Sequence, residues 1–296
     1  MHIEHLESDR DDAAIILIEG LERDLRILHV TDSHMAEADE RDPDAAEHVE
    51  RYGELFQQRT PGGVPAREVF HSTVARGGRL GVDGAALTGD IIHFPALAGI
   101  EIIQREMQDL GVPFIYTLGN HDWHFPHLEW TESTREQHYP RFDGLTHGNP
   151  RCQALELGGV RLIALDNSNY QVSAEQVAFL RREISRGQPC LLFIHIPLWI
   201  DSLIPAVMER WLAPIVMAAE SGWTDETREK WKVPGNEDST LECSQLLRTG
   251  PSQNVAGIFC GHVHFPHVDA YREGRWQYVT APGFEGGYRV IELKRA

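Results

Sequence analysis

The sequence has few cysteines and no spacing of them that is typical of a metal site. Its four cysteines, Cys152, Cys190, Cys243 and Cys260, are scattered, and three of them lie in apolar, strand-like segments. We therefore expect buried free thiols, and no zinc site built from cysteine.

Long apolar runs and a leader peptide are also missing. No stretch approaches the roughly 20 apolar residues that a membrane-spanning helix needs. The first residues, MHIEHLESDRDD, are acidic and polar and lack the apolar core of a secretory signal. The sequence therefore predicts a cytoplasmic protein with no membrane partner.

Basic residues are scarce relative to acidic ones, with 27 Lys and Arg against 45 Asp and Glu and a formal net charge of −18. This balance argues against a surface that coats nucleic acid or binds anionic membranes, because both need a basic footprint. A phosphate substrate stays compatible, since divalent cations in a cleft would make the local potential positive. The 296 residues are enough for a single large α/β domain, and the oligomeric state stays open.

Five short polar blocks are present, and each follows an apolar segment that has the pattern of a buried strand. They are Asp32-Ser33-His34, Gly89-Asp90, Gly119-Asn120-His121-Asp122, His195, and Gly261-His262-Val263-His264. An α/β fold collects such side chains in the loops at the ends of its strands. Imidazoles, carboxylates and an amide without any thiolate suit Mn, Fe, Zn, Co or Ni better than Ca.

In this order, the five blocks resemble the calcineurin-like metallophosphoesterases, and the resemblance extends from residue 32 to residue 264. It implies an α/β fold, a four-layer αββα sandwich in which two mixed β-sheets are flanked by helices. It also implies two metal ions, Mn, Fe or Zn. One metal would be held by Asp32, His34 and His264 and the other by Asn120, His195 and His262, with Asp90 bridging both.

The implied reaction is hydrolysis of a phosphoric ester. A water shared by two cations roughly 3.5–4 Å apart loses a proton near neutral pH and attacks phosphorus as hydroxide. His121 would protonate the leaving alkoxide or stabilise the transition state, and Asp122 would accept hydrogen bonds that orient a neighbour.

The chain departs from two branches of the family three residues after Asp90. Phosphoprotein phosphatases have there an Asp that pairs with the catalytic His, and purple acid phosphatases have a metal-binding Tyr. This chain has His93, for which support of a neighbour or the loop is the first interpretation and contact with substrate the second. The tripeptide His-Phe-Pro occurs three times, and its Phe94, Phe125 and Phe265 are candidate neighbours of the cleft.

Helices and strands are expected to alternate in the first half of the chain. Residues 13–20 and 25–31 have the pattern of strands, and residues 65–78 and 96–111 have that of helices ending at glycine. This alternation is typical of a largely parallel sheet. Residues 35–64 are interpreted as a helical or irregular insertion.

The second half predicts another sheet. Residues 152–166 have the pattern of a hairpin around Gly158-Gly159, Ser173 is a candidate N-cap for a helix through Arg186, and a further hairpin and strand follow residue 264. We therefore expect two sheets, one from each half, within a single domain.

Residues 198–240 have the character of an insertion. They hold four of the seven tryptophans and a helix-like run from 202 to 220. They either pack a helical pair onto the core or form a cap over the metals, with Trp199 as a candidate substrate contact.

The resemblance implies a hydrolase acting on a small phosphoester. It favours a phosphodiesterase, like the bacterial enzymes that cleave cyclic nucleotides or glycerophosphodiesters. A phosphomonoesterase is the alternative, because HIPL and APGFEGGYRV resemble small purple-acid-phosphatase-like proteins. Nucleotide pyrophosphatases and nucleases are weaker options. A non-catalytic scaffold is disfavoured, since all seven ligand positions and His121 are present.

Overall fold

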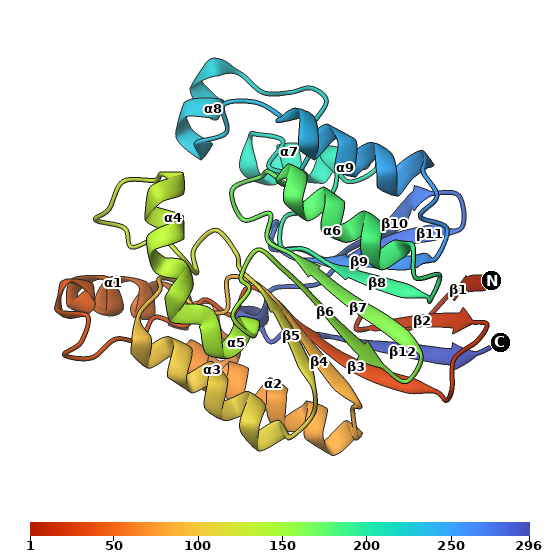
Figure 1. Ribbon diagram of the computed structural model, residues 1–296. Helices are drawn as coiled ribbons and strands as arrows, with labels where there is room; N and C mark the ends of the chain where they lie inside the picture. Colours follow the sequence, from red (N-terminus) through yellow and green to blue (C-terminus); the bar gives the residue numbers. More distant parts are fainter.

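Two six-stranded sheets lie face to face, and helices cover the outer face of each (Figure 1). The computed structural model describes residues 1–296. The first sheet has the order β1-β2-β12-β3-β4-β5, with β1 Ile3–Leu6, β2 Ala13–Ile18, β12 Arg289–Arg295, β3 Leu25–Val30, β4 Gly84–Thr88 and β5 Phe114–Thr117. The second has the order β10-β11-β9-β8-β7-β6, with β10 His267–Arg272, β11 Arg275–Val279, β9 Val255–Cys260, β8 Cys190–Phe193, β7 Val160–Leu165 and β6 Cys152–Leu157.

Helices complete the four layers. They are α1 Ala46–Gln57, α2 Ala66–Leu80, α3 Leu97–Leu110, α4 Glu132–His138, α5 Asp143–Thr146, α6 Ala174–Ile184, α7 Ile204–Trp211, α8 Asp225–Trp231 and α9 Asp238–Thr249. α2 and α3 pack on the first sheet through one apolar cluster, and α6 and α9 pack on the second through another. A third cluster fills the space between the two sheets. The expected αββα sandwich is confirmed.

The division into one sheet from each half of the chain is wrong for one strand. β12, at the end of the chain, lies between β2 and β3 in the first sheet, parallel to β2 and antiparallel to β3. Ile291 and Leu293 of this strand are fully buried in the core between the sheets. Burial of these side chains, rather than closeness along the chain, selects the partner strands.

Two expected helix ends are also wrong. α2 continues through Gly77 and Gly78 and ends before Gly81, which has φ 62°. A Cβ on Gly77 would collide with Leu28, so this glycine allows close packing on the sheet instead of ending the helix. The run from 202 to 220 is helical only in α7, which ends where Leu212 has φ 59°. Pro214 keeps the helix from resuming, and the following buried residues form an irregular segment in which Met217 bridges Leu198.

The cysteines and the segment before α2 agree with the sequence-based expectation. All four cysteines are free thiols, and Cys190, Cys243 and Cys260 are buried. Residues 37–64 contain α1 and short 3-10 turns. No helix of the structure combines the length and the apolar character that crossing a bilayer requires.

Candidate metal centre

The five polar blocks come together at one edge of the two sheets. β3, β4 and β5 are adjacent and parallel, and β8 and β9 are adjacent and parallel in the other sheet. Their carboxyl ends therefore bring the loops that follow them into one region. Strand direction explains why residues more than 200 positions apart meet there.

Two triads of potential metal ligands form in this region, each with its ligand atoms within 4.8 Å of one another. They are Asp32, His34 and His264, and Asp90, His195 and His262. In the first, His264 Nε2 lies 3.3 Å from Asp32 Oδ1 and 3.1 Å from His34 Nε2. In the second, His195 Nε2 lies 3.2 Å from Asp90 Oδ2.

Asp90 and Asn120 connect these triads. The Asp90 Oδ2 that contacts His195 is also 3.8 Å from His34 Nε2, so this carboxylate lies between the two groups. Asn120 Oδ1 lies 3.2 Å from His195 Nε2. The structure thus brings all seven residues of the expected ligand set to one place.

Backbone strain is concentrated at these residues. Of the ten non-glycine residues with positive φ, five belong to the expected ligand set: Asp32, His34, Asp90, His262 and His264, with φ between 48° and 70°. The left-handed conformation is unfavourable for such side chains and persists where the surrounding structure enforces it. Strain of this kind is characteristic of functional sites.

Glycines in the blocks allow the loops to approach closely. A Cβ on Gly119 would overlap the Asp90 carboxylate, and a Cβ on Gly261 would overlap the side chains of Thr31 and Asp32. Only glycine lets these loops pass so near the carboxylates. This is the physical reason for the glycines of the third and fifth blocks.

The charges of the buried site fit a cation. Asp32 Oδ1 is buried without a hydrogen-bond partner, although buried carboxylate oxygens are normally paired. Burial holds the pKa of His34 and of His262 well below its ordinary value, so both imidazoles are neutral and have a lone pair to offer. Burial alone would raise the pKa of Asp90, but His195 and His121 hold it well below its usual range. His34, His262 and Asp90 thus have the protonation states that metal ligands need. Burial lowers the pKa of His195 but the Asp90 carboxylate raises it to about 9, so this imidazole must release its proton to bind a metal.

Asp122 joins the loops that follow β4 and β5 through hydrogen bonds. Its carboxylate accepts hydrogen bonds from the backbone N–H groups of Asp90 at 2.9 Å, Gly119 at 2.8 Å and Ile92 at 3.2 Å. Asp90 Oδ1 in turn accepts the N–H of His121 at 2.8 Å. The second and third blocks are therefore locked to each other.

Sequence reasoning missed the segment Asp166–Tyr170. Asn167 Oδ1 accepts from the N–H groups of His195 and Ile196, at 3.1 and 3.0 Å. The buried Tyr170 hydroxyl lies 3.0 Å from His262 Nε2. The sequence pattern could have indicated this segment, because these polar residues also follow directly after a buried strand, β7.

Residues 25–266 match the family described as calcineurin-like phosphoesterase. The chain belongs to this family. It is 25% identical over 250 residues to a cAMP/cGMP dual-specificity phosphodiesterase of Mycobacterium tuberculosis. That alignment covers 82% of this chain and 62% of the relative, so the chain spans less than two thirds of the relative's length.

Solved structures share the fold of this calcineurin-like phosphoesterase. A dimetal phosphatase from Danio rerio superposes with a TM-score of 0.55 at 11% identity, covering 91% of this chain and 93% of that one. A purple acid phosphatase from yellow lupin seeds superposes with a TM-score of 0.52 at 16% identity, covering 93% of this chain and 46% of that one. At such low identity the likeness shows the fold alone.

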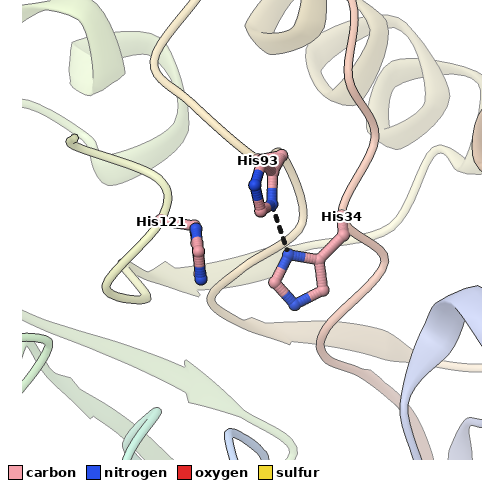
Figure 2. Close-up of side chains that lie close together, drawn as sticks. All are labelled: His34, His93 and His121. Atoms are coloured by element: carbon pink, nitrogen blue, oxygen red, sulfur yellow. Dashed lines mark hydrogen bonds between the residues drawn. The ribbon is translucent and has the colours of Figure 1, made fainter. Parts of the chain in front are cut away.

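His93 stands between two residues of the phosphoesterase site (Figure 2). Its Nδ1 lies 3.0 Å from His34 Nδ1, and its ring stacks on that of His121 with the centroids 4.2 Å apart. His34, His93 and His121 also form a third group that could hold a metal ion. A neutral imidazole has one lone pair, so His34 can serve either this group through Nδ1 or the Asp32 triad through Nε2.

Two other candidate residues, Phe125 and Trp199, are packed among other side chains. Phe125 is buried and stacks on Phe94 at 5.9 Å, and Trp199 is buried in the core of the second sheet, with its Nε1 donating to Asp201 at 2.9 Å. The segment 198–240 reaches the centre through Trp211 instead. Its Nε1 donates to the carbonyl oxygen of Val263 at 2.9 Å, and its ring lies 5.4 Å from that of His264.

A cavity of about 690 Å³ opens beside the centre. His93 and His121 line one side of it, and Lys230 and Lys232, from the end of α8, line it as well. Trp130 also contributes to its wall. The cavity is large enough for a small organic phosphate.

Proposed function

We propose that the chain is a metal-dependent phosphodiesterase that hydrolyses small phosphoric diesters. The observation that carries this proposal is the pair of buried Asp/His triads joined by Asp90, with His121 beside them at the edge of an open cavity. Similarity to a cAMP/cGMP phosphodiesterase supports a diester rather than a monoester substrate.

The donor set fits two divalent cations. Asp32, His34 and His264 would hold one, and Asn120, His195 and His262 the other, with Asp90 shared. When bound, such cations lower the pKa of water and neutralise charge on the phosphoryl oxygens. Neutral imidazoles and an amide add no negative charge, so the cations stay strong Lewis acids.

The hydrogen bonds of the histidines are consistent with this assignment. His195 Nδ1 donates to the carbonyl oxygen of Thr88 at 2.7 Å, so in the neutral ring the lone pair would be on Nε2, the atom that faces Asp90. The Tyr170 hydroxyl occupies His262 Nε2, which leaves Nδ1 for a ligand role. Fixing of the tautomer by the second ring nitrogen is characteristic of metal-bound histidine.

His121 is the proposed proton donor. Its backbone is fixed by Asp90 and its side chain lines the cavity, so a ring nitrogen can give a proton to the leaving alkoxide oxygen. Burial lowers the pKa of His121 and the nearby Asp90 carboxylate partly offsets this effect, so Asp90 favours the protonated ring that a general acid needs. General acid catalysis of this kind typically contributes 10²–10⁴-fold to the rate.

The test is turnover of bis-p-nitrophenyl phosphate and p-nitrophenyl phosphate by the purified chain with Mn²⁺, with and without a chelator. We expect cleavage that requires metal and is faster for the diester. Faster cleavage of the monoester would favour the phosphomonoesterase alternative, and no metal-dependent cleavage of either would favour a scaffold role.

Three variants identify the site. Asp90→Ala should abolish turnover and lose at least one metal equivalent, whereas His121→Ala should keep its metal content and lose rate about 10²–10⁴-fold. His71→Ala, at an exposed histidine on the outer helix α2, is the matched control and should behave as the wild type. Undiminished turnover in His121→Ala would remove this residue from the mechanism.

A further inference from the structure

Two of the three lysines of this acidic chain lie beside the proposed active site. Lys230 and Lys232 line the cavity that His121 also lines. Neither ammonium group has a carboxylate within 4.0 Å, whereas Lys294, on the far strand β12, pairs with both Asp24 and Glu292. In a chain with a net charge of −18, unpaired cations beside the cavity point to an anionic ligand.

A second cavity, of about 400 Å³, continues from the first. Lys232, Trp130 and Thr131 line both cavities, so the two are neighbours. The second cavity contains none of the expected metal ligands. It extends the space available to a substrate away from the metals.

Two residues that line the second cavity carry buried donor atoms without an acceptor. Trp123 Nε1 and Arg135 Nε lack hydrogen-bond partners, although the two residues are only 1% and 4% exposed. Arg135 uses Nη2 on Glu132 at 2.7 Å, and its Nη1 is 3.5 Å from Asp166. A ligand with acceptor oxygens that reaches either donor would supply the missing hydrogen-bond partner.

Most of the charged side chains around the second cavity already have an ion-pair partner. Arg151 also lines it and pairs with Glu132 and Glu136, so the arginines are largely matched by carboxylates. Of the charged groups that line this cavity, Lys232 and Glu237 have no oppositely charged partner within 4.0 Å, and Lys232 also lines the first cavity. A group that extends from the metal side into the second cavity would therefore pass Lys232.

We propose that this second cavity is a subsite for a further phosphate group of the substrate, with Lys232 as its specificity-determining residue. The inference rests on the proposed phosphodiesterase function and deepens it. The preferred substrates are then linear phosphodiesters that carry an additional phosphate, rather than diesters with a single phosphate.

The test compares two substrates that differ by one phosphate. They are the 5′-p-nitrophenyl ester of thymidine 5′-phosphate and the same ester with a 3′-phosphate. The expected kcat/KM is at least tenfold higher for the compound with the 3′-phosphate. Lys232→Met should reduce this ratio to below threefold, Trp123→Phe should reduce it partly, and Lys294→Met should leave it unchanged.

A binding measurement separates this inference from the proposed function. In chelator, thymidine 3′,5′-bisphosphate should bind the wild type at least tenfold more tightly than thymidine 5′-phosphate by calorimetry, and Lys232→Met should remove the difference. Equal kcat/KM for the two esters, or equal binding, would overturn the subsite while leaving diester hydrolysis intact. If no diester is cleaved, the proposed function is wrong. The ratio of the affinities for the bisphosphate and the monophosphate then shows whether the second cavity binds a phosphate group.

Discussion

His93 Nδ1 lies 3.0 Å from His34 Nδ1, which ties a residue outside the expected ligand set to one inside it. If His34 binds metal through Nε2, its Nδ1 carries the proton and donates to His93. His93 thereby fixes both the tautomer of His34 and, through the stacked rings, the position of His121. This chain has an imidazole where related branches have an Asp or a Tyr.

Loss of this hydrogen bond should weaken metal binding. We expect His93→Phe, which keeps an aromatic ring against His121, to raise the Kd for Mn²⁺ about 10–100-fold by calorimetry. His93→Gln is the matched variant, because its amide oxygen can accept from His34, and it should retain most of the affinity. Equal affinity in wild type and His93→Phe would exclude a supporting role for His93.

Tyr170→Phe tests the contact that holds His262. Removal of the hydroxyl 3.0 Å from Nε2 should raise the Kd for Mn²⁺ about tenfold with little change in the fold. Tyr271→Phe is the control, since this buried hydroxyl donates to the carbonyl oxygen of Val255 at 3.1 Å and not to the site. An equal effect of both substitutions on Kd would show a general packing effect instead.

Gly119→Ala should destroy the site while the fold persists. The added Cβ would overlap the Asp90 carboxylate and backbone, so we expect Mn²⁺ affinity and diesterase activity to fall more than 100-fold. Gly53→Ala, in α1 with open space around its Cα, should leave activity unchanged and stabilise the chain by up to about 1 kcal/mol. Activity of Gly119→Ala near that of wild type would contradict the close approach of the two loops.

His29 should make the stability of the protein depend on pH. This residue is buried between Thr280 and Thr88, with hydrogen bonds of 2.8 and 2.7 Å, and burial lowers its pKa from 6.5 to about 3. Between these two values the unfolded chain binds a proton that the folded chain does not. The free energy of unfolding therefore keeps its full value above pH 6.5. Below this pH it decreases by about 1.4 kcal/mol per pH unit.

His29→Gln removes this titration while offering both threonines a hydrogen bond. Between pH 6.5 and 5, the free energy of unfolding of the wild type should fall by about 2 kcal/mol more than that of His29→Gln. Urea denaturation in chelator measures the difference, and His71→Gln, at an exposed position, should follow the wild type. Parallel curves for wild type and His29→Gln would show that His29 is not held neutral.

Most of the fold was predictable because local patterns and burial agree along most of this chain. Apolar runs of strand length precede each polar block, and α3 ends where Gly111 allows a left-handed turn. Gly77 misled the prediction, because in a sequence a glycine needed for close packing looks the same as one that ends a helix. β12 was misplaced because its apolar pattern specifies burial but not which two strands it joins.

Ligand chemistry and strand pattern are local properties, so the order of the amino acids specifies which side chains could bind metal and which strand delivers each of them. The free nitrogen of each histidine depends instead on partners distant in the chain, such as Thr88, His93 and Tyr170, and is therefore defined by the three-dimensional packing. This packing also brings Lys232 to both cavities, because the path of residues 198–240 over the core does not follow from any motif.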